Sequence, residues 1–320
     1  MADSSIAVLP VPDDFPELKG LHHGASVSNL AGYVAFYGLA ELGVHRMHVI
    51  HSRCGEQIVV QRFGPADAPA SVFICHGYYD HVGIYGHLIR FWVERGYAVV
   101  CFDQVGHGLS GGRRAHIEDF STYLDVIEDV WEFAEADLAL GETVHWVGQS
   151  MGGALTMEYL HRHPGGVRGE VVLFAPLVRP YAWWLNRWIF ALAKLMIEER
   201  SRTVTNNADN PEFIDLARSD PLQPRVLPVA WVAAMVDWFK QFEGYPASAL
   251  QPLIIQGQAD RTVDWRHNGR VLEQRYPEAR WLWLPEARHH LVNESATLRN
   301  RMWDWLDEHL QPAVGGGERT

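Results

Sequence analysis

The chain has 320 residues, a hydrophobic share of 48%, a charged share of 21% and a formal net charge of −12. These values are typical of a soluble globular protein with a sizeable core, and the length favours one large domain over two. No stretch of the sequence clusters Lys and Arg. This excludes nucleic acid as a partner, because binding to its phosphate backbone needs such clusters.

The N-terminal region, 1–44, is predicted to contain a tail and one helix. Acidic residues precede its first apolar run, whereas a signal peptide begins with positive charge, so we do not expect a signal peptide. The apolar run 30–44 carries Glu41 and is shorter than the roughly 20 residues that span a bilayer, so we expect a helix packed on the domain. The sequence has three cysteines, an odd number, and two of them fall in predicted strands. Reduced thiols and a cytoplasmic location are therefore expected.

Beyond residue 44, short apolar runs alternate with helical patterns. Segments 45–52 and 56–63 alternate between apolar and polar residues and suit an edge hairpin. The later apolar runs are 71–75, 97–102, 144–148, 171–174, 253–256 and 281–284. Runs of this length, each followed by turn residues and a helix, are typical of parallel strands in a sheet that helices cover on both faces. The predicted fold class is α/β, with a mostly parallel, doubly covered sheet.

The alternation stops at 177–247, which holds two helical patterns and no convincing strand. We expect this insertion to form a helical cap over the carboxyl edge of the sheet, where ligands bind in open α/β folds. It divides the predicted core into 45–176 and 248–311, and a flexible tail follows at 312–320. The first cap helix is rich in tryptophan, and Trp184 and Trp188 are candidate substrate-binding residues.

The residues Gly148-Gln149-Ser150-Met151-Gly152 form a G-x-S-x-G between a predicted strand and a predicted helix. Two glycines let a strand turn sharply into a helix, with the serine hydroxyl exposed at the apex. Because a serine hydroxyl is a weak nucleophile, it needs a base, and the base needs an acid that orients it. Ser150 is therefore the candidate nucleophile.

Candidates for the acid and the base follow the last two predicted strands. Asp260 comes directly after one strand and His289 after the next, which places both side chains at the carboxyl edge of the sheet. Asp264 competes with Asp260, although its position favours a helix N-cap role. His290 adjoins His289, and local chemistry leaves the choice between these two histidines open.

Attack of a serine on a carbonyl carbon creates an oxyanion, which backbone N–H groups must stabilise. One donor is expected from Met151, the residue after the nucleophile. The other is expected from Tyr78, which follows Gly77 after the first central strand. Neither H-E-x-x-H nor the phosphate-binding G-x-x-x-x-G-K-[ST] occurs in the sequence, and we expect no metal and no organic cofactor.

These residues lie in four blocks of sequence. The blocks are ICHGYYDHVGIYGHL from Ile74, FDQVGHGLSGGRRAHIEDFSTYLDVIEDV from Phe102, VGQSMGGAL from Val147, and the pair QGQADRTVD and EARHHLVNE from Gln256 and Glu286. They resemble the monoacylglycerol lipase and lysophospholipase group of the α/β-hydrolases. The resemblance implies a serine hydrolase with Ser150, Asp260 and His289 as its triad, and it favours His289 over His290. The cap does not match the group, and Tyr78-Tyr79 is bulkier than the small residues common there.

From the triad and the resemblance we expect hydrolysis of a carboxylic ester through an acyl-enzyme. The expected substrate is a small lipid, a monoacylglycerol or a lysophospholipid. The same triad also suits small non-lipid esters, thioesters, peptides or acyl transfer to an alcohol. Two readings from other classes are a ligand-binding protein without activity and a membrane-interaction protein that acts through the Trp-rich helix. That helix suggests transient contact of the cap with a membrane surface, which fits a cytoplasmic protein peripheral at a membrane.

Overall fold

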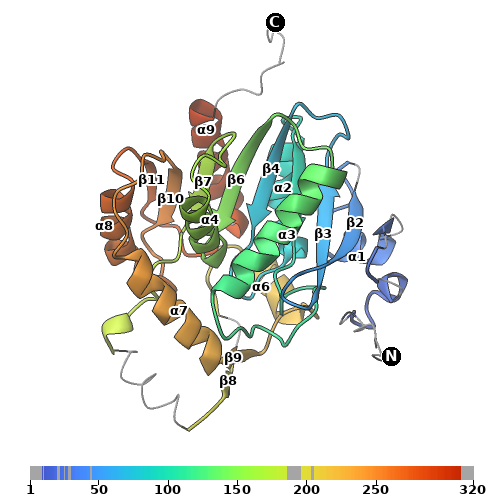
Figure 1. The fold of residues 1–320 in the computed structure, drawn as a ribbon, viewed down its shortest axis with the longest axis horizontal. Helices are drawn as coiled ribbons and strands as arrows, with labels where there is room; N and C mark the ends of the chain where they lie inside the picture. The colour runs from blue at the N-terminus through green and yellow to red at the C-terminus, as the bar shows by residue number, and fades with distance from the viewer. Residues whose placement is uncertain are drawn as a thin grey trace, which may run out of the picture.

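The computed structural model describes residues 9, 11–19, 22–24, 26–27, 30–43, 45–185, 196–202 and 205–310. Within them, nine strands form one sheet (Figure 1). Its order is β1 (Ser26–Val27), β2 (Arg46–His51), β3 (Gln57–Phe63), β5 (Ala98–Phe102), β4 (Ala70–Cys75), β6 (Thr143–Gln149), β7 (Val171–Phe174), β10 (Leu253–Gly257) and β11 (Arg280–Leu284). Pairs among β1, β2, β3 and β5 are antiparallel, and all others are parallel. The predicted α/β fold class is confirmed.

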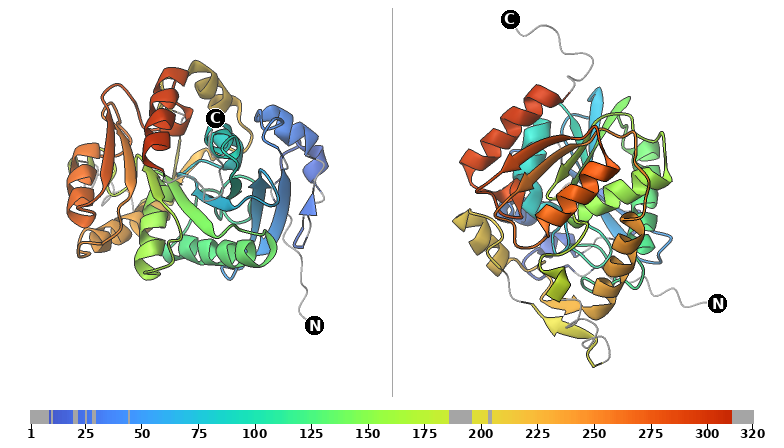
Figure 2. Two further views of the ribbon diagram at one scale, coloured as in Figure 1. Left: turned by 90° about the horizontal axis from the view of Figure 1, so that it is seen from above. Right: turned by 90° about the vertical axis from the view of Figure 1, so that its left-hand side faces the viewer.

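Helices cover both faces of the sheet (Figure 2). One face carries α2 (Gly86–Val93) and α9 (Ala296–His309), and the other carries α3 (Ser121–Asp137), α4 (Met151–Arg162) and α8 (Trp265–Arg275). Alternate residues of one strand enter different cores: Val72 and Ile74 of β4 pack on the side of α2, and Phe73 packs on the side of α3. This burial on both faces is the reason that each parallel strand is a continuous apolar run.

The N-terminal region differs from the prediction of a helix over 30–44. Only Ala31–Phe36 forms a helix, α1, after a short 3-10 turn at Pro16–Leu18. Gly38 has a φ of 65°, a left-handed conformation that ends the helix. The Tyr33 side chain of α1 is fully buried, so the helix does pack on the domain. Residue 44 and the tail at 312–320 lie outside the described residues.

The segment between β7 and β10, where the cap is predicted, holds strands as well as helices. Helix α7 (Val229–Phe242) coincides with the second helical pattern, whereas most of the first pattern, 186–195, lies outside the described residues. Strands β8 (Glu199–Ser201) and β9 (Val226–Pro228) pair antiparallel, and α6 (Pro211–Ser219) lies between them in the chain. Strands of three residues carry too little alternation to be predicted. In Figure 1, β8, β9 and α7 gather at the lower end of the sheet.

Two short 3-10 turns lie in the loops after β4 and β11, at Val82–Tyr85 (η2) and Leu291–Asn293 (η3). Both turns are fully buried, and they contact each other. Their contact therefore joins the loop after β4, a central strand, to the loop after β11, the edge strand. Of the helices that the structure describes, none is both long and apolar enough to cross a membrane.

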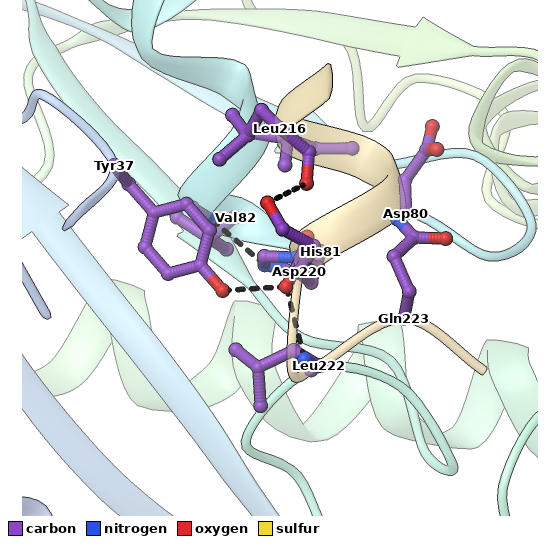
Figure 3. A network of polar contacts seen from close by, with 12 residues as sticks. Tyr37, Asp80, His81, Val82, Leu216, Asp220, Leu222 and Gln223 are labelled. Carbon is purple, nitrogen blue, oxygen red and sulfur yellow. Dashed lines mark hydrogen bonds and ion pairs between the residues drawn. The ribbon is translucent and has the colours of Figure 1, made fainter. Parts of the chain in front are cut away.

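A buried polar network joins three distant segments (Figure 3). Tyr37 donates its hydroxyl proton to Asp220 Oδ1 at 2.7 Å, and His81 Nε2 lies 2.8 Å from Asp220 Oδ2. The N–H of Leu222 donates to the same carboxylate at 2.9 Å. Burial disfavours the charged form of His81, but the Asp220 carboxylate outweighs burial and raises the pKa of His81. Although burial also opposes the charged form of Asp220, His81 holds the pKa of that carboxyl below its usual value.

Asp220→Ala is expected to lower the free energy of unfolding by about 3–5 kcal/mol, because it leaves His81 buried without its charged partner. Since the pKa of His81 is raised in the folded state, its contribution is complete below about pH 6.5 and is lost as pH rises through the raised value. Asp220 has a lowered pKa, so its contribution is lost only as pH falls below about 3.9.

Urea unfolding of the wild type and the variant at pH 6 and pH 9 measures the loss of stability and its dependence on the charge of His81. Asp215→Ala, an exposed position on helix α6, which ends one residue before Asp220, is the matched control and should change stability by less than about 0.5 kcal/mol. The expected loss in the free energy of unfolding is on the order of several kcal/mol. A loss of under about 1 kcal/mol for Asp220→Ala at pH 6 would contradict the assignment of this pair as a stabilising contact.

Candidate active site

Ser150 stands at a sharp turn between β6 and α4. Its backbone has a φ of 53° and a ψ of −115°, which is strained for a residue with a side chain. A Cβ on Gly148 would lie 2.5 Å from the Gly152 carbonyl oxygen, and a Cβ on Gly152 would lie 1.9 Å from the carbonyl oxygen of Cys75. Strand and helix can meet this closely only because both positions lack a side chain. The turn leaves Ser150 at the apex.

The structure brings Ser150, His289 and Asp260 together. His289 Nε2 lies 2.9 Å from Ser150 Oγ, and His289 Nδ1 lies 2.7 Å from Asp260 Oδ2. A carboxylate only accepts, so Nδ1 carries the proton and Nε2 is left to accept from the serine hydroxyl. All three side chains are buried, with at most 8% of any of these residues exposed. This is the geometry that a serine nucleophile and its base require.

Neighbouring backbone groups hold the acid and the base in place. Asp260 and His289 lie in the loops after β10 and β11, two adjacent parallel strands whose carboxyl ends share one edge. Asp260 Oδ1 accepts from the N–H groups of Thr262 at 2.7 Å and Val263 at 3.0 Å. The side-chain amide of Gln149 donates to the His289 carbonyl oxygen at 3.0 Å. The orientation of the pair therefore depends on the sheet edge and on the strand before Ser150.

The charges around His289, at the carboxyl edge of the sheet, favour its protonated form. Burial alone would lower the pKa of His289, because it penalises the imidazolium. The charge of Asp260 and its hydrogen bond to Nδ1 act in the opposite direction, and the pKa of His289 is raised above its usual value. Such a base is well placed to take a proton from Ser150 during reaction.

The competing acid and base lie in other networks. His290 Nε2 is 3.1 Å from Asp80 Oδ1, and Asp80 Oδ2 accepts from the Tyr85 hydroxyl at 2.8 Å. Asp264 caps helix α8, where its side chain accepts from the His267 N–H at 3.2 Å. Neither competitor contacts Ser150 in the described part of the chain, so both hold loops around the site.

The loop after β4 packs against the turn at Ser150. The N–H of Gly77 donates to the Tyr85 hydroxyl at 2.9 Å, and a Cβ on Gly77 would lie 3.3 Å from the carbonyl oxygen of Gln149. This close approach brings the backbone of Tyr78 beside the nucleophile. Met151 is the first residue of α4, where backbone N–H groups have no intrahelical partner. Tyr78 lines the same cavity as Ser150, and the oxyanion role of the Tyr78 and Met151 N–H groups stays a prediction.

An apolar cavity of about 410 Å³ opens above Ser150. The Trp231 ring of α7 stacks on the Tyr78 ring, with centroids 3.5 Å apart and an interplanar angle of 13°. The apolar residues of its wall are Tyr78, Tyr79, Leu177, Pro180, Trp183, Ile197, Leu227, Val229, Trp231, Val232, Met235 and Val263.

Tryptophan does line this cavity, but the residues differ from the expected ones. Trp184 is 69% exposed and is not among the described residues that line the wall, so its substrate contact stays a prediction. Trp188 lies outside the described residues. The wall uses Trp183 and Trp231 instead, and the amphipathic pattern of α7 was the only signal for Trp231 in the sequence.

Two of the three cysteines, Cys75 and Cys101, are buried in strands of the sheet. Burial raises the pKa of Cys75 to about 12 and that of Cys101 well above its usual value, so neither forms a thiolate at neutral pH. Among the described residues, no three His, Cys, Asp or Glu side chains gather as a metal site requires.

Comparisons with known proteins agree with this geometry. The family described as serine aminopeptidase, S33, matches residues 66–296, well over half of the chain. The monoacylglycerol lipase of Mycolicibacterium smegmatis is 25% identical over 80% of this chain and 95% of that protein. Human monoglyceride lipase is 27% identical over 75% of this chain and 82% of that protein.

Solved structures show the same fold. A soluble variant of monoglyceride lipase from Saccharomyces cerevisiae has a TM-score of 0.67 and 18% identity, over 80% of this chain and 93% of that one. The monoacylglycerol lipase of Paleococcus ferrophilus has a TM-score of 0.64 and 22% identity, over 79% and 99%. This chain therefore belongs to the serine aminopeptidase S33 family of α/β-hydrolases, and it is a carboxylic ester hydrolase that resembles the monoacylglycerol lipases.

Proposed function

We propose that the protein hydrolyses long-chain acyl esters of glycerol-type alcohols, with Ser150 as nucleophile, His289 as base and Asp260 as the acid that orients it. The observation that carries this proposal is the chain of contacts from Ser150 Oγ to His289, at 2.9 Å, and from His289 to Asp260, at 2.7 Å, beneath an apolar cavity. The similarity to monoacylglycerol lipases and the membership of the family support it.

In the proposed mechanism, Ser150 Oγ attacks the ester carbonyl carbon as its proton passes to His289 Nε2. The N–H groups of Tyr78 and Met151 stabilise the tetrahedral oxyanion. The bond to the alcohol oxygen breaks as His289 gives its proton to that oxygen. Water then attacks the acyl-enzyme, loses a proton to His289 and releases the fatty acid, and the proton returns to Ser150. Asp260 stays ionised and stabilises the imidazolium.

The wall of the cavity favours a lipid acyl chain over a peptide. A free α-amino group, the feature that an aminopeptidase must recognise, is a cation that needs a carboxylate partner when it is buried. No Asp or Glu side chain lines the cavity in the described part of the chain, and its charged member is Arg200. Apolar walls gain free energy from each buried methylene group instead. Ester hydrolysis therefore fits the site better than the aminopeptidase activity in the family description.

The outer surface of the predicted cap supports contact with a lipid surface. Tyr181, Trp184, Leu185 and Met196 are all exposed, with 69% exposure for Trp184 and 83% for Met196. Contiguous exposed apolar surface marks interaction sites, and Trp184 and Leu185 are neighbours in the chain. We propose that this surface touches membranes or lipid aggregates transiently while the substrate enters.

Activity is expected to climb with acyl chain length by about fourfold in kcat/KM for each methylene group, because each buried CH₂ contributes ~0.8 kcal/mol, and to level off where the cavity ends. Val232→Phe, which fills the wall and creates no void, should move the plateau to shorter chains. Trp184→Ala is the matched control and should keep the wild-type plateau. The measurement is a series of p-nitrophenyl esters below their aggregation limits. If kcat/KM of the wild type does not change with acyl chain length, the proposal of a lipid substrate is wrong and the protein is a hydrolase of small esters.

Covalent labelling tests the nucleophile directly. A fluorophosphonate probe should modify the native protein, and peptide mapping should place the label on Ser150. Because the probe needs an activated serine, the denatured protein should not react. Labelling at another residue, or none at all, would overturn the proposed function.

A further inference from the structure

A second hollow, of about 550 Å³, lies beside His289, and the residues that line it are mostly of polar types. Thr262 belongs to the walls of both this hollow and the apolar cavity over Ser150, so the two spaces meet at the triad. The residues that line it are Thr205, Asn206, Asn207, Ala259, Arg261, Thr262, Arg288 and His289. The proposed function uses only His289 from this set.

Two arginines give the hollow a positive charge in a chain whose net charge is −12. Among the residues that the structure describes, neither Arg261 nor Arg288 has an ion pair with a carboxylate within 4.0 Å, and no Asp or Glu lines the hollow. Residues 186–195 and 203–204, which lie outside the described ranges, contain no Asp or Glu in the sequence. Within the described residues, no carboxylate therefore pairs directly with either guanidinium.

Each arginine is the sequence neighbour of a triad residue. Arg261 directly follows Asp260, and Arg288 directly precedes His289. The N–H of Arg288 donates to Glu294 at 2.7 Å, and its Nη1 donates to the Asn206 carbonyl oxygen at 3.1 Å. A guanidinium has five N–H donors, so most of them remain for a ligand. Two such forks match the oxygens of a phosphate group.

The proposed mechanism decides which part of the substrate reaches this hollow. His289 must give its proton to the leaving alcohol oxygen, so the alcohol part lies beside His289 while the acyl chain lies over Ser150. The apolar cavity takes the chain, and the polar hollow remains for the alcohol. Glycerol has six non-hydrogen atoms and at roughly 30 Å³ for each water-sized group would leave most of the hollow unfilled.

We propose that this hollow binds a phosphate group on the leaving alcohol, through Arg261 and Arg288, so that the preferred substrate is a monoacylglycerol phosphate. This inference rests on the proposed function and names its substrate class. Hydrolysis then breaks the acyl ester bond, His289 protonates the alcohol oxygen, and the products are a fatty acid and glycerol phosphate with its phosphate intact. A phosphocholine headgroup fits less well, because no acidic side chain in the described wall can pair with its quaternary ammonium.

The test compares three substrates with the same acyl chain, each below its aggregation limit: a 1-acylglycerol, a 1-acylglycerol 3-phosphate and the corresponding phosphocholine ester. The wild type should prefer the phosphate monoester by at least about tenfold in kcat/KM. Arg261→Gln and Arg288→Gln should each reduce that preference about three- to tenfold, measured as the ratio of kcat/KM for the phosphate ester to kcat/KM for the neutral ester in the same variant, because exposed charge pairs contribute modestly. Arg270→Gln, which removes an exposed arginine outside both spaces, is the matched control.

Inhibition separates a headgroup site from a site for free phosphate. Glycerol 3-phosphate should compete with the neutral ester, and glycerol should not, and this inhibition should weaken with added salt. Inorganic phosphate that inhibits as well, while the wild type shows no preference for the phosphate ester, would mean an anion site unconnected with the substrate and would overturn the proposal. Equal rates on the neutral and the phosphate ester that Arg→Gln does not alter would also overturn it. Failure to hydrolyse any of the three esters would instead refute the proposed function.

Discussion

The Ser150→Ala variant is expected to lose about 10⁶ in kcat, because the proposed mechanism has no other nucleophile and the members of a triad act as one unit. The fold should remain intact. Ser150 lies at an apex, alanine keeps the Cβ, and removing a single hydroxyl oxygen leaves no core cavity. Its φ of 53° is as strained for alanine as for serine, so this cost is common to both proteins.

Burst kinetics with a p-nitrophenyl ester, together with thermal unfolding, measures both parts of this expectation. Gly152→Ala gives a useful contrast. Its new Cβ would lie 1.9 Å from the Cys75 carbonyl oxygen, so this variant should lose stability along with activity. If a folded Ser150→Ala protein keeps more than about a tenth of the wild-type activity, the assignment of the nucleophile is wrong.

His289→Ala and His290→Ala are expected to fail in different ways. His289→Ala should lose activity on the scale of Ser150→Ala, with little effect on folding, because its ring is the proposed base. His290→Ala removes the partner of buried Asp80, whose pKa this histidine helps to hold below its usual value against the penalty of burial. That variant should therefore be less stable by about 3 kcal/mol or more and should keep much of its activity at low temperature.

The pH profile adds a second measurement for this pair. Only neutral His289 can accept the serine proton, so kcat/KM should rise with pH and level off above its pKa. Because that pKa is raised in the folded protein, the midpoint should lie above about 6.5. The His290→Ala profile should keep this rising shape, with a midpoint no higher than that of the wild type, because the Asp80 charge that helps to raise the pKa of His289 loses its partner. An inactive His290→Ala with an active His289→Ala would exchange the two roles.

Some features follow from short stretches of sequence alone. The strands could be predicted because burial on both faces leaves an uninterrupted apolar run, a property of each strand by itself. The turn at Ser150 could be predicted because its requirement for glycine at 148 and 152 is local, and the structure shows that a Cβ at either position would meet backbone oxygen. The order of nucleophile, acid and base followed from which strand each residue comes after.

Other features were decided only by the tertiary structure. His289 and His290 have the same local chemistry, and only the direction of each ring brings one to Ser150 and the other to Asp80. Trp231 lines the cavity and Trp184 does not, because of the way the cap faces the sheet. The periodicity of the sequence does not reveal that orientation.

Contacts between charged residues that are far apart in the sequence could not be predicted either. His81 and Asp220 are 139 residues apart, and Arg261 and Arg288 come to one hollow only because β10 and β11 are neighbours. Sequence by itself determined the chemistry of each segment, because that chemistry depends on nearby residues. The tertiary structure decided which segments meet, because a contact between distant residues leaves no periodic signal along the chain.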